Sequence, residues 1–226
     1  MMDFGNNTTR LVDSYADFNP MPGSKLLTLR LGKFKPPVGL ERWQSEQEVA
    51  FVERGLPTNL APFRDIGLMA FGELVPSQLE YQLAVANGAV DLGDNNNDPD
   101  DNKDMYARVF AYPFRWSEVG MLQGFGLGVA GSYGDHIGTT SAPNMMDGYR
   151  TLAQARFFTY PTAGPAVLAS GTQWRLNPQA MYYNGSFGVV SEYIINSQEV
   201  SRGANRATLD HKAWTAVASY VLTGED

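Results

Sequence analysis

Cysteine is absent from the 226 residues, which excludes disulfide bonds, zinc–thiolate sites and cysteine nucleophiles. Positive charge is also scarce, because 17 Lys and Arg stand against 24 Asp and Glu and give a formal net charge of -7. A general nucleic-acid binder needs a basic face, so the composition argues against that class of protein. His136 and His211 are the two histidines, and neither has neighbours that predict acid–base chemistry. We therefore expect no enzyme, no cofactor and no nucleic-acid partner.

Long hydrophobic runs are missing as well. No window approaches the roughly 20 consecutive apolar residues of a membrane-spanning helix. The first residues, MMDFGNNTTR, lack the basic and apolar regions of a signal peptide. A helical membrane protein is therefore not expected, whereas a β-barrel stays open because its strands carry apolar residues at alternate positions.

Alternating segments of roughly 8–14 residues, each ended by turn-forming residues, dominate the chain. Together with 23 Gly, 13 Pro and 12% aromatic residues they predict an all-β protein. We expect ten strands: Leu11–Phe18, Lys25–Phe34, Asp65–Val75, Gln78–Gly88, Met105–Phe114, Phe125–Gly134, Arg150–Tyr160, Gly171–Asn184, Phe187–Ser197 and Thr208–Thr223.

The alternation permits two architectures. In Gly171–Asn184, Trp174, Leu176 and Tyr182 share one face, while the opposite face is polar. A soluble β-sandwich that binds carbohydrate would bury the first face, and a porin would turn it toward lipid. Several segments reach the about 9–11 residues that cross a bilayer, and tight turns alternate with long loops. Both observations favour the transmembrane antiparallel barrel.

Proline is unusual within such a strand, because it cannot donate a hydrogen bond to a neighbouring strand. Pro178 lies in the middle of Gly171–Asn184. We expect a β-bulge there.

Residues 35–63 break the β pattern. Ser45-Glu46-Gln47-Glu48 has the form of a helix capping box, and Val49 and Val52 follow at helical spacing. Gly55 and Pro57 then end the run. We expect a long loop with a short helix around Val49–Glu53, and loops of this length are usually functional.

Acidic residues crowd a second loop, Asp91–Asp104. Asp94, Asn96, Asp98 and Asp100 resemble a calcium loop, but Pro99 and Met105 replace its glycine and its bidentate glutamate. We expect no resident metal and leave a weak surface ion site open. Gly126–Gly131 matches the dinucleotide pattern GxGxxG, but alternation continues through it, so we interpret it as a strand.

Family-like motifs follow one another along nearly the whole chain. The stretch Leu31–Pro62, LGKFKPPVGLERWQSEQEVAFVERGLPTNLAP, resembles members of the phosphate-selective porin O/P family. The resemblance continues through Arg64–Gly67 and Gly171–Gly185, and ends at Ala218–Glu225. It implies a trimeric barrel of sixteen strands in the Gram-negative outer membrane. A loop in the lumen, here residues 35–63, narrows the pore, and basic side chains draw phosphate or similar anions through it.

The resemblance also implies site residues. The family's phosphate-binding lysine aligns with Arg42, a site serine with Ser45 and a site aspartate with Asp13, whereas a second serine is replaced by Glu46. The family's arginine-rich strand aligns near Ile194–Arg202, where one arginine remains. Strict phosphate selectivity is therefore not expected.

Further basic residues lie on the polar faces of the predicted strands. They are Arg30, Arg156 and Arg175, and we expect them to extend a basic track along the pore. The alternative is that these arginines simply solvate the lumen wall. Since about ten strands are fewer than sixteen, we interpret residues 1–226 as one partial barrel domain, an internal fragment in contact with outer-membrane lipid.

Overall fold

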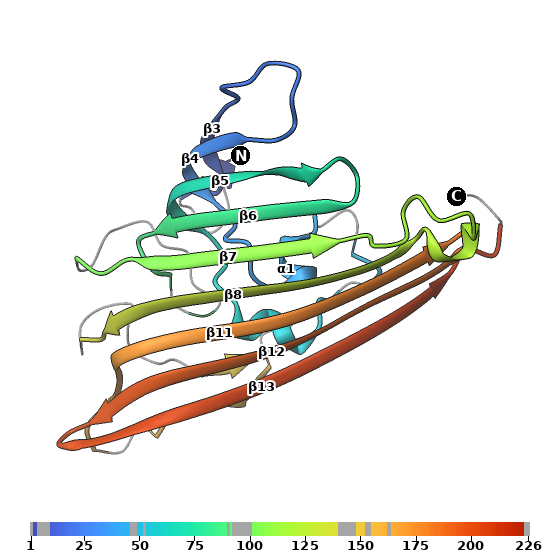
Figure 1. Ribbon diagram of the computed structural model, residues 1–226. Helices are drawn as coiled ribbons and strands as arrows, with labels where there is room; N and C mark the ends of the chain where they lie inside the picture. The colour runs from blue at the N-terminus through green and yellow to red at the C-terminus, as the bar shows by residue number, and fades with distance from the viewer. Residues whose placement is uncertain are drawn as a thin grey trace.

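A single antiparallel sheet of nine strands dominates the computed structural model, which describes residues 2–3, 10–45, 49–51, 53–89, 91, 101–139, 148–151, 155–161 and 164–223. The spatial order of its strands is β13-β12-β11-β8-β7-β6-β5-β4-β3 (Figure 1). These strands are β3 (Ser14–Phe18), β4 (Thr28–Phe34), β5 (Asp65–Val75), β6 (Leu79–Ala86), β7 (Asp104–Ala111), β8 (Phe125–Ile137), β11 (Val167–Asn184), β12 (Phe187–Arg202) and β13 (Asn205–Tyr220).

The remaining elements are short. β1 (Met2–Asp3) pairs with β2 (Arg10–Leu11), and β9 (Tyr149–Arg150) pairs with β10 (Arg156–Phe158). The helices are α1 (Leu40–Trp43) and the 3-10 turns η2 (Leu56–Leu60) and η3 (Gly120–Leu122). Among the described residues, every helix is too short or too polar to cross a membrane.

The all-β prediction is confirmed, with two corrections. The expected strand Arg150–Tyr160 is wrong, because β9 and β10 fold as a separate two-stranded sheet outside the nine-stranded one. The sandwich alternative is also wrong, since the long strands form one sheet and not two packed ones. Over the described residues this sheet stays open, with β3 and β13 as its edges, so a closed barrel is not seen.

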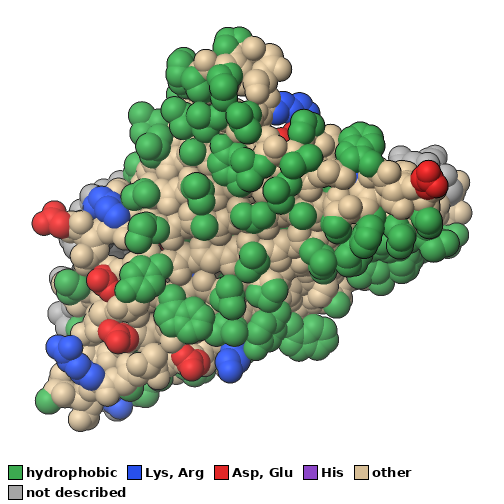
Figure 2. Space-filling model, in the orientation of Figure 1, with side chains coloured by type: hydrophobic (Ala, Val, Ile, Leu, Met, Phe, Trp, Pro, Cys, Tyr) green, Lys and Arg blue, Asp and Glu red, His purple; other side chains and the backbone are tan. Residues whose placement is uncertain are grey.

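The two faces of the sheet differ in polarity. α1 and the other described residues at the two ends of the loop 35–63 lie against the inner face, behind the strands in Figure 1. One row of cross-strand partners on that face runs through Asp17, Arg30, Met69, Ala84, Tyr106, Ser132, Arg175, Asn196 and His211. The adjacent row on the outer face begins with Leu31, Leu68, Val85, Met105, Tyr133 and Trp174. These side chains are exposed, and hydrophobic groups cover much of the outer face (Figure 2).

Pro178 is accommodated without the expected bulge, which corrects that prediction. Pairs Leu176↔Ile195 and Gln179↔Glu192 keep one register on both sides of it, so Tyr193 lies opposite the proline. The Asn177 side-chain amide donates to the Tyr193 carbonyl at 3.0 Å, which replaces the N–H that proline lacks. The irregularity in this strand pair falls instead between Ala169 and Gln173.

Candidate functional site

The loop 35–63 is fastened to the inner face through backbone N–H groups at the start of α1. Leu40 and Glu41 donate their N–H groups to the Glu192 carboxylate on β12, at 2.8 and 3.1 Å. Gly39 donates its N–H to Asn177 Oδ1 on β11 at 3.0 Å. Asn177 also donates to Glu192 at 3.0 Å, and both side chains are almost fully buried. The wall thus presents a preformed acceptor for this end of the loop.

This arrangement corrects the position of the predicted helix. The helix is α1, upstream of Ser45, and described residues 49–51 are not helical. Residues 46–48 and 52, which complete the predicted capping box and helix, lie outside the described part of the chain. None of the side chains at the start of α1 caps it. The carboxylate of Glu192 serves as its acceptor, and local sequence patterns cannot reveal a cap from a distant strand.

The middle of the loop is held by its own polar groups. Gly55 donates its N–H to Glu41 Oε2 at 2.7 Å, and Arg54 donates to the Glu41 and Gln44 carbonyls at 3.1 and 3.2 Å. Gly55 is the N-cap of η2 and Pro57 stands in its first turn. Residues expected to end a helix therefore begin one, in keeping with the preference of proline for the first helical turn.

A second anchor holds the far end of the loop. Arg175 on β11 donates to the Leu60 carbonyl at 3.1 Å, to Ser132 at 3.0 Å and to Asp91 Oδ1 at 2.6 Å. Asp91 also accepts hydrogen bonds from Asn196 and, at 3.4 Å, from Tyr149. The guanidinium of Arg175 is 0% exposed and that carboxylate 12%. Arg175 therefore ties two loops to the sheet in a buried ion pair.

Two further buried carboxylates adjoin this anchor. Asp65 accepts the N–H groups of Gly88 and Ala89 at 2.8 and 3.0 Å. Asp104 accepts the Tyr106 hydroxyl at 3.0 Å and lies 3.1 Å from His136 Nε2. These contacts hold the residues that flank the acidic loop Asp91–Asp104 against the inner face of the sheet.

The β9–β10 hairpin packs on the inner side of β13 through aromatic rings. Tyr149, Phe158 and Tyr160 surround His211, with ring centroids 5.1, 5.7 and 6.5 Å away. Burial raises the pKa of Tyr160 to about 12, so its hydroxyl stays protonated beside His211. Arg156 lies in β10 and is exposed, and its expected place on a wall strand of the sheet is therefore wrong.

Arg42 and Asp13 are brought together through two intervening residues. The Arg42 and Arg64 guanidinium groups each lie 4.2 Å from the centre of the Phe63 ring. Arg64 in turn donates to both Asp13 oxygens, at 2.8 and 3.1 Å. Arg42 is 3% exposed, whereas Ser45 is exposed just beyond α1. The structure thus joins Asp13, Arg64, Phe63 and Arg42 in one contiguous group.

The charge on Asp13 makes this group sensitive to pH. Partial burial opposes the charged form, but the Arg64 guanidinium outweighs it and lowers the pKa of Asp13 below its ordinary value of 3.8. A carboxylate whose folded-state pKa is lowered stabilises the fold above its unfolded pKa, and that contribution disappears as the pH falls through the folded value.

We therefore expect Asp13→Asn to reduce the free energy of unfolding at about pH 7 and to leave it nearly unchanged at about pH 2. Urea unfolding of the refolded protein, followed by tryptophan fluorescence at both pH values, measures the difference. An equal loss at both pH values would show that the carboxylate charge contributes nothing.

Arg30 faces inward, as predicted, but it is also paired. It donates to both oxygens of Asp17 at 2.7 and 2.8 Å and stacks 3.8 Å over the Tyr15 ring. Arg30 pairs with Asp17, and Arg175 pairs with Asp91 and, at 3.8 Å, with Asp104. Neither arginine belongs to the Arg42 group.

Sequence reasoning missed Glu192, Asn177, Asp91 and Arg64. Glu192 lies on the same strand face as Asn196 and Gln198, but Ile194 interrupts this polar row and Ser197 and Glu199 are polar on the other face, so the local pattern is a weak signal. Nothing local distinguishes Asp91 from the other acids of its loop.

Aromatic residues border the outer apolar face on two sides. On the side toward the long loops they form the cross-strand pairs Tyr133↔Trp174 and Tyr193↔Trp214, the second of which lies near the middle of β12 and β13. At the short-turn end the corresponding residues on β8, β11, β12 and β13 are Phe125, Tyr182, Phe187 and Tyr220. At about 3.3 Å per residue the two borders lie about 20–26 Å apart along the strands, comparable with the ~25 Å apolar band of outer-membrane barrels.

A sheet with an aromatic-bordered apolar outer face, a polar inner face and a folded-in loop has the construction of a porin wall. The family model for phosphate-selective porin O and P matches residues 2–226, and the chain belongs to this family. The resemblance noted in the sequence is thereby confirmed. It is a family of channels rather than enzymes. The comparison with curated proteins gave no match.

Proposed function

We propose that the protein is a diffusion pore of the Gram-negative outer membrane that passes small anions such as phosphate or polyphosphate and works as a homotrimer. The nine-stranded sheet forms part of its wall, with lipid on the outer face. Residues 35–63 form the constriction. Family membership and the contrast between the two faces of the sheet support this proposal.

Basic side chains cluster at the base of the loop 35–63, and this cluster is our reason for proposing that anions pass. Lys35 Nζ and Arg54 Nη2 donate to the same oxygen, the Gln44 carbonyl, at 3.1 and 3.2 Å. Arg42 and Arg64 likewise share the Phe63 ring. Four cations gathered in this way raise the local positive potential, although Arg64 is paired with the Asp13 carboxylate and the whole chain carries -7. An anion that passes the loop would be stabilised there.

Arg42 is our first candidate for direct anion contact, with Ser45 beside it. A guanidinium offers two parallel N–H donors to a pair of phosphate oxygens. Asp13 would act through Arg64 by fixing its orientation. Arg30, Arg156 and Arg175 would contribute to the field rather than contact the anion, because Arg30 and Arg175 are already paired with carboxylates and Arg156 lies in β10.

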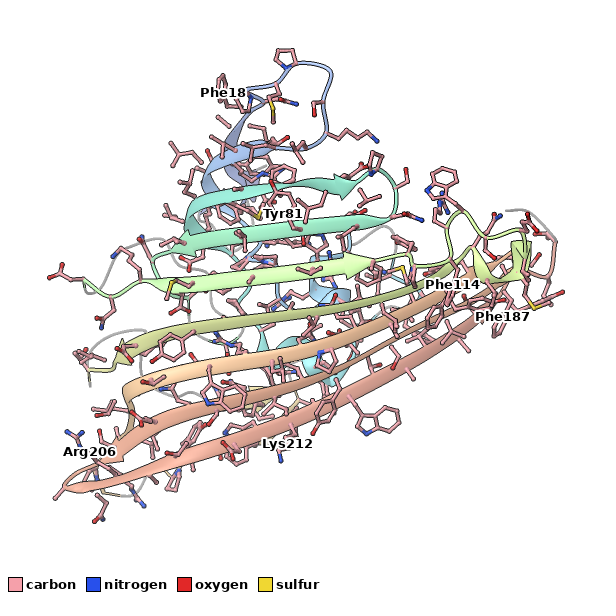
Figure 3. All side chains as sticks on the ribbon, in the orientation of Figure 1. Phe18, Tyr81, Phe114, Phe187, Arg206 and Lys212 are labelled. Carbon is pink, nitrogen blue, oxygen red and sulfur yellow. The ribbon has the colours of Figure 1, made fainter. Side chains whose placement is uncertain are left out.

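Reversal potentials across planar bilayers in a potassium chloride gradient test this. We expect anion preference in the native protein and a clear reduction of it in Arg42→Ala, because one cation leaves the constriction. Arg206→Ala is the matched control, since Arg206 lies on the outer edge of β13 away from the loop (Figure 3). Cation preference that Arg42→Ala leaves unchanged would overturn the proposal.

A further inference from the structure

The connection between β7 and β8, residues 112–124, is the longest described connection at its end of the sheet. The turns between β5 and β6 and between β11 and β12 lie at the same end and span residues 76–78 and 185–186, and the connection between β3 and β4 there spans residues 19–27. Tight turns are usual on one side of an outer-membrane barrel, with long loops on the other. The length of this connection therefore needs a separate explanation.

Most large side chains of this connection are apolar and exposed at the surface. Phe114, Trp116, Val119, Met121 and Leu122 are all exposed, Trp116 by 70% and Met121 by 63%. The charged residues of the segment are Arg115 and Glu118. So many large apolar groups on one surface segment indicate contact with another apolar phase.

The segment is nevertheless well folded. Arg115, Ser117, Leu122 and Gln123 donate their N–H groups to carbonyls three residues earlier, at 2.9–3.1 Å. Its ends are tied to neighbouring turns and strands, since Tyr112 donates to Gln78 and Tyr183 donates to the Gly124 carbonyl. A Cβ on Gly124 would lie 1.7 Å from the Tyr183 carbonyl oxygen, so glycine is required for this close approach. Because these backbone groups are already hydrogen-bonded within the protein, contact of the segment with lipid costs less free energy.

The connection also continues the aromatic border of the outer face. Phe114 lies 6.0 Å from Phe125, which pairs across strands with Tyr182. Tyr182 lies 6.2 Å from Phe187, which pairs with Tyr220. Phe114 and Phe187 both mark this end of the sheet in Figure 3. The exposed segment and the lipid-facing band are thus one surface.

We propose that residues 112–124 form an interfacial anchor that places Trp116 and its apolar neighbours at the boundary between headgroups and acyl chains of the leaflet at the short-turn end. Tryptophan favours that boundary, because its ring is apolar and its N–H polar. Arg115, beside Trp116, is positioned to meet lipid phosphates. The inference rests on the proposed membrane location and adds a lipid partner for this segment.

Single-tryptophan variants in phospholipid vesicles test the anchor, since the chain holds four tryptophans. One variant keeps Trp116, a second keeps Trp214 on the outer face, and a third keeps Trp43 on the inner side, with the others changed to phenylalanine. Bromine-labelled phospholipids then quench the tryptophans that touch lipid. Channel conductance identifies the variants that fold.

We expect the Trp116 fluorescence to fall about twofold with bromines near the headgroups, and less with bromines at the chain ends. Trp214 should also be quenched and Trp43 should not. Quenching of Trp214 without Trp116 would overturn the anchor alone, whereas absence of quenching at both positions would overturn the membrane location as well. If Trp116 is shielded from lipid and from aqueous iodide, and becomes accessible when oligomers dissociate, the segment contacts a second copy and the lipid proposal fails.

Discussion

Glu192→Ala is expected to release the constriction loop and to produce a larger and noisier single-channel current. The substitution removes the acceptor of two backbone N–H groups at the start of α1. Each buried donor that loses its partner costs about 1–3 kcal/mol. The free energy that holds this end of the loop against β12 is then largely lost, so the loop samples positions away from the wall.

Single-channel recordings in planar bilayers measure both the mean conductance and its fluctuations. Glu192→Gln keeps one acceptor oxygen and should fall between the native protein and Glu192→Ala. Glu199→Ala is the matched control, because this carboxylate lies on the same strand and also accepts a backbone N–H, that of Thr172 on β11, but is exposed on the outer face. If Glu192→Ala shows native conductance and native noise, the loop is held by other contacts and the anchor role assigned to Glu192 is wrong.

Arg175→Met is expected to lower the stability of the fold by about 3–5 kcal/mol, the usual cost of breaking a buried ion pair from one side. Methionine fills a similar volume but leaves the Asp91 carboxylate buried without its cation. It also removes the hydrogen bonds to Leu60 and Ser132. The midpoint of urea unfolding, followed by tryptophan fluorescence in lipid vesicles, should therefore fall markedly.

The double variant Arg175→Met with Asp91→Asn separates charge from packing. It should recover part of the lost stability, because one uncompensated charge is gone, while Asp104, which lies 3.8 Å from Arg175, keeps its own. Arg206→Met removes an arginine from the outer face and should stay within about 0.5 kcal/mol of the native protein. Native stability in Arg175→Met would mean that Arg175 is a solvated pore cation, as the sequence alone suggested.

The helical part of the loop shows where sequence reasoning stops. The capping-box pattern at Ser45 pointed to a helix after it, yet α1 ends before Ser45. Its first N–H groups bind Glu192, some 150 residues away in the chain. Local patterns record the preferences of neighbouring residues, and this carboxylate reaches the helix through tertiary contact.

The candidate cations show a similar limit. The sequence placed Arg30, Arg156 and Arg175 on polar strand faces, and alternation was a sound basis for Arg30 and Arg175. It did not reveal that Asp17 and Asp91 neutralise two of them. Whether a guanidinium is available to a passing anion depends on which carboxylate the register and the loops place beside it.

The sequence by itself determined the two faces of the wall, nine of its strands and the long loop between β4 and β5. Side chains alternate strictly along a strand, so the local pattern suffices to separate an apolar face from a polar one. Tertiary structure decided where the loop lies, which carboxylates hold it and which cations they neutralise. Those outcomes depend on strand register and on contacts between distant segments, and these are fixed when the sheet assembles.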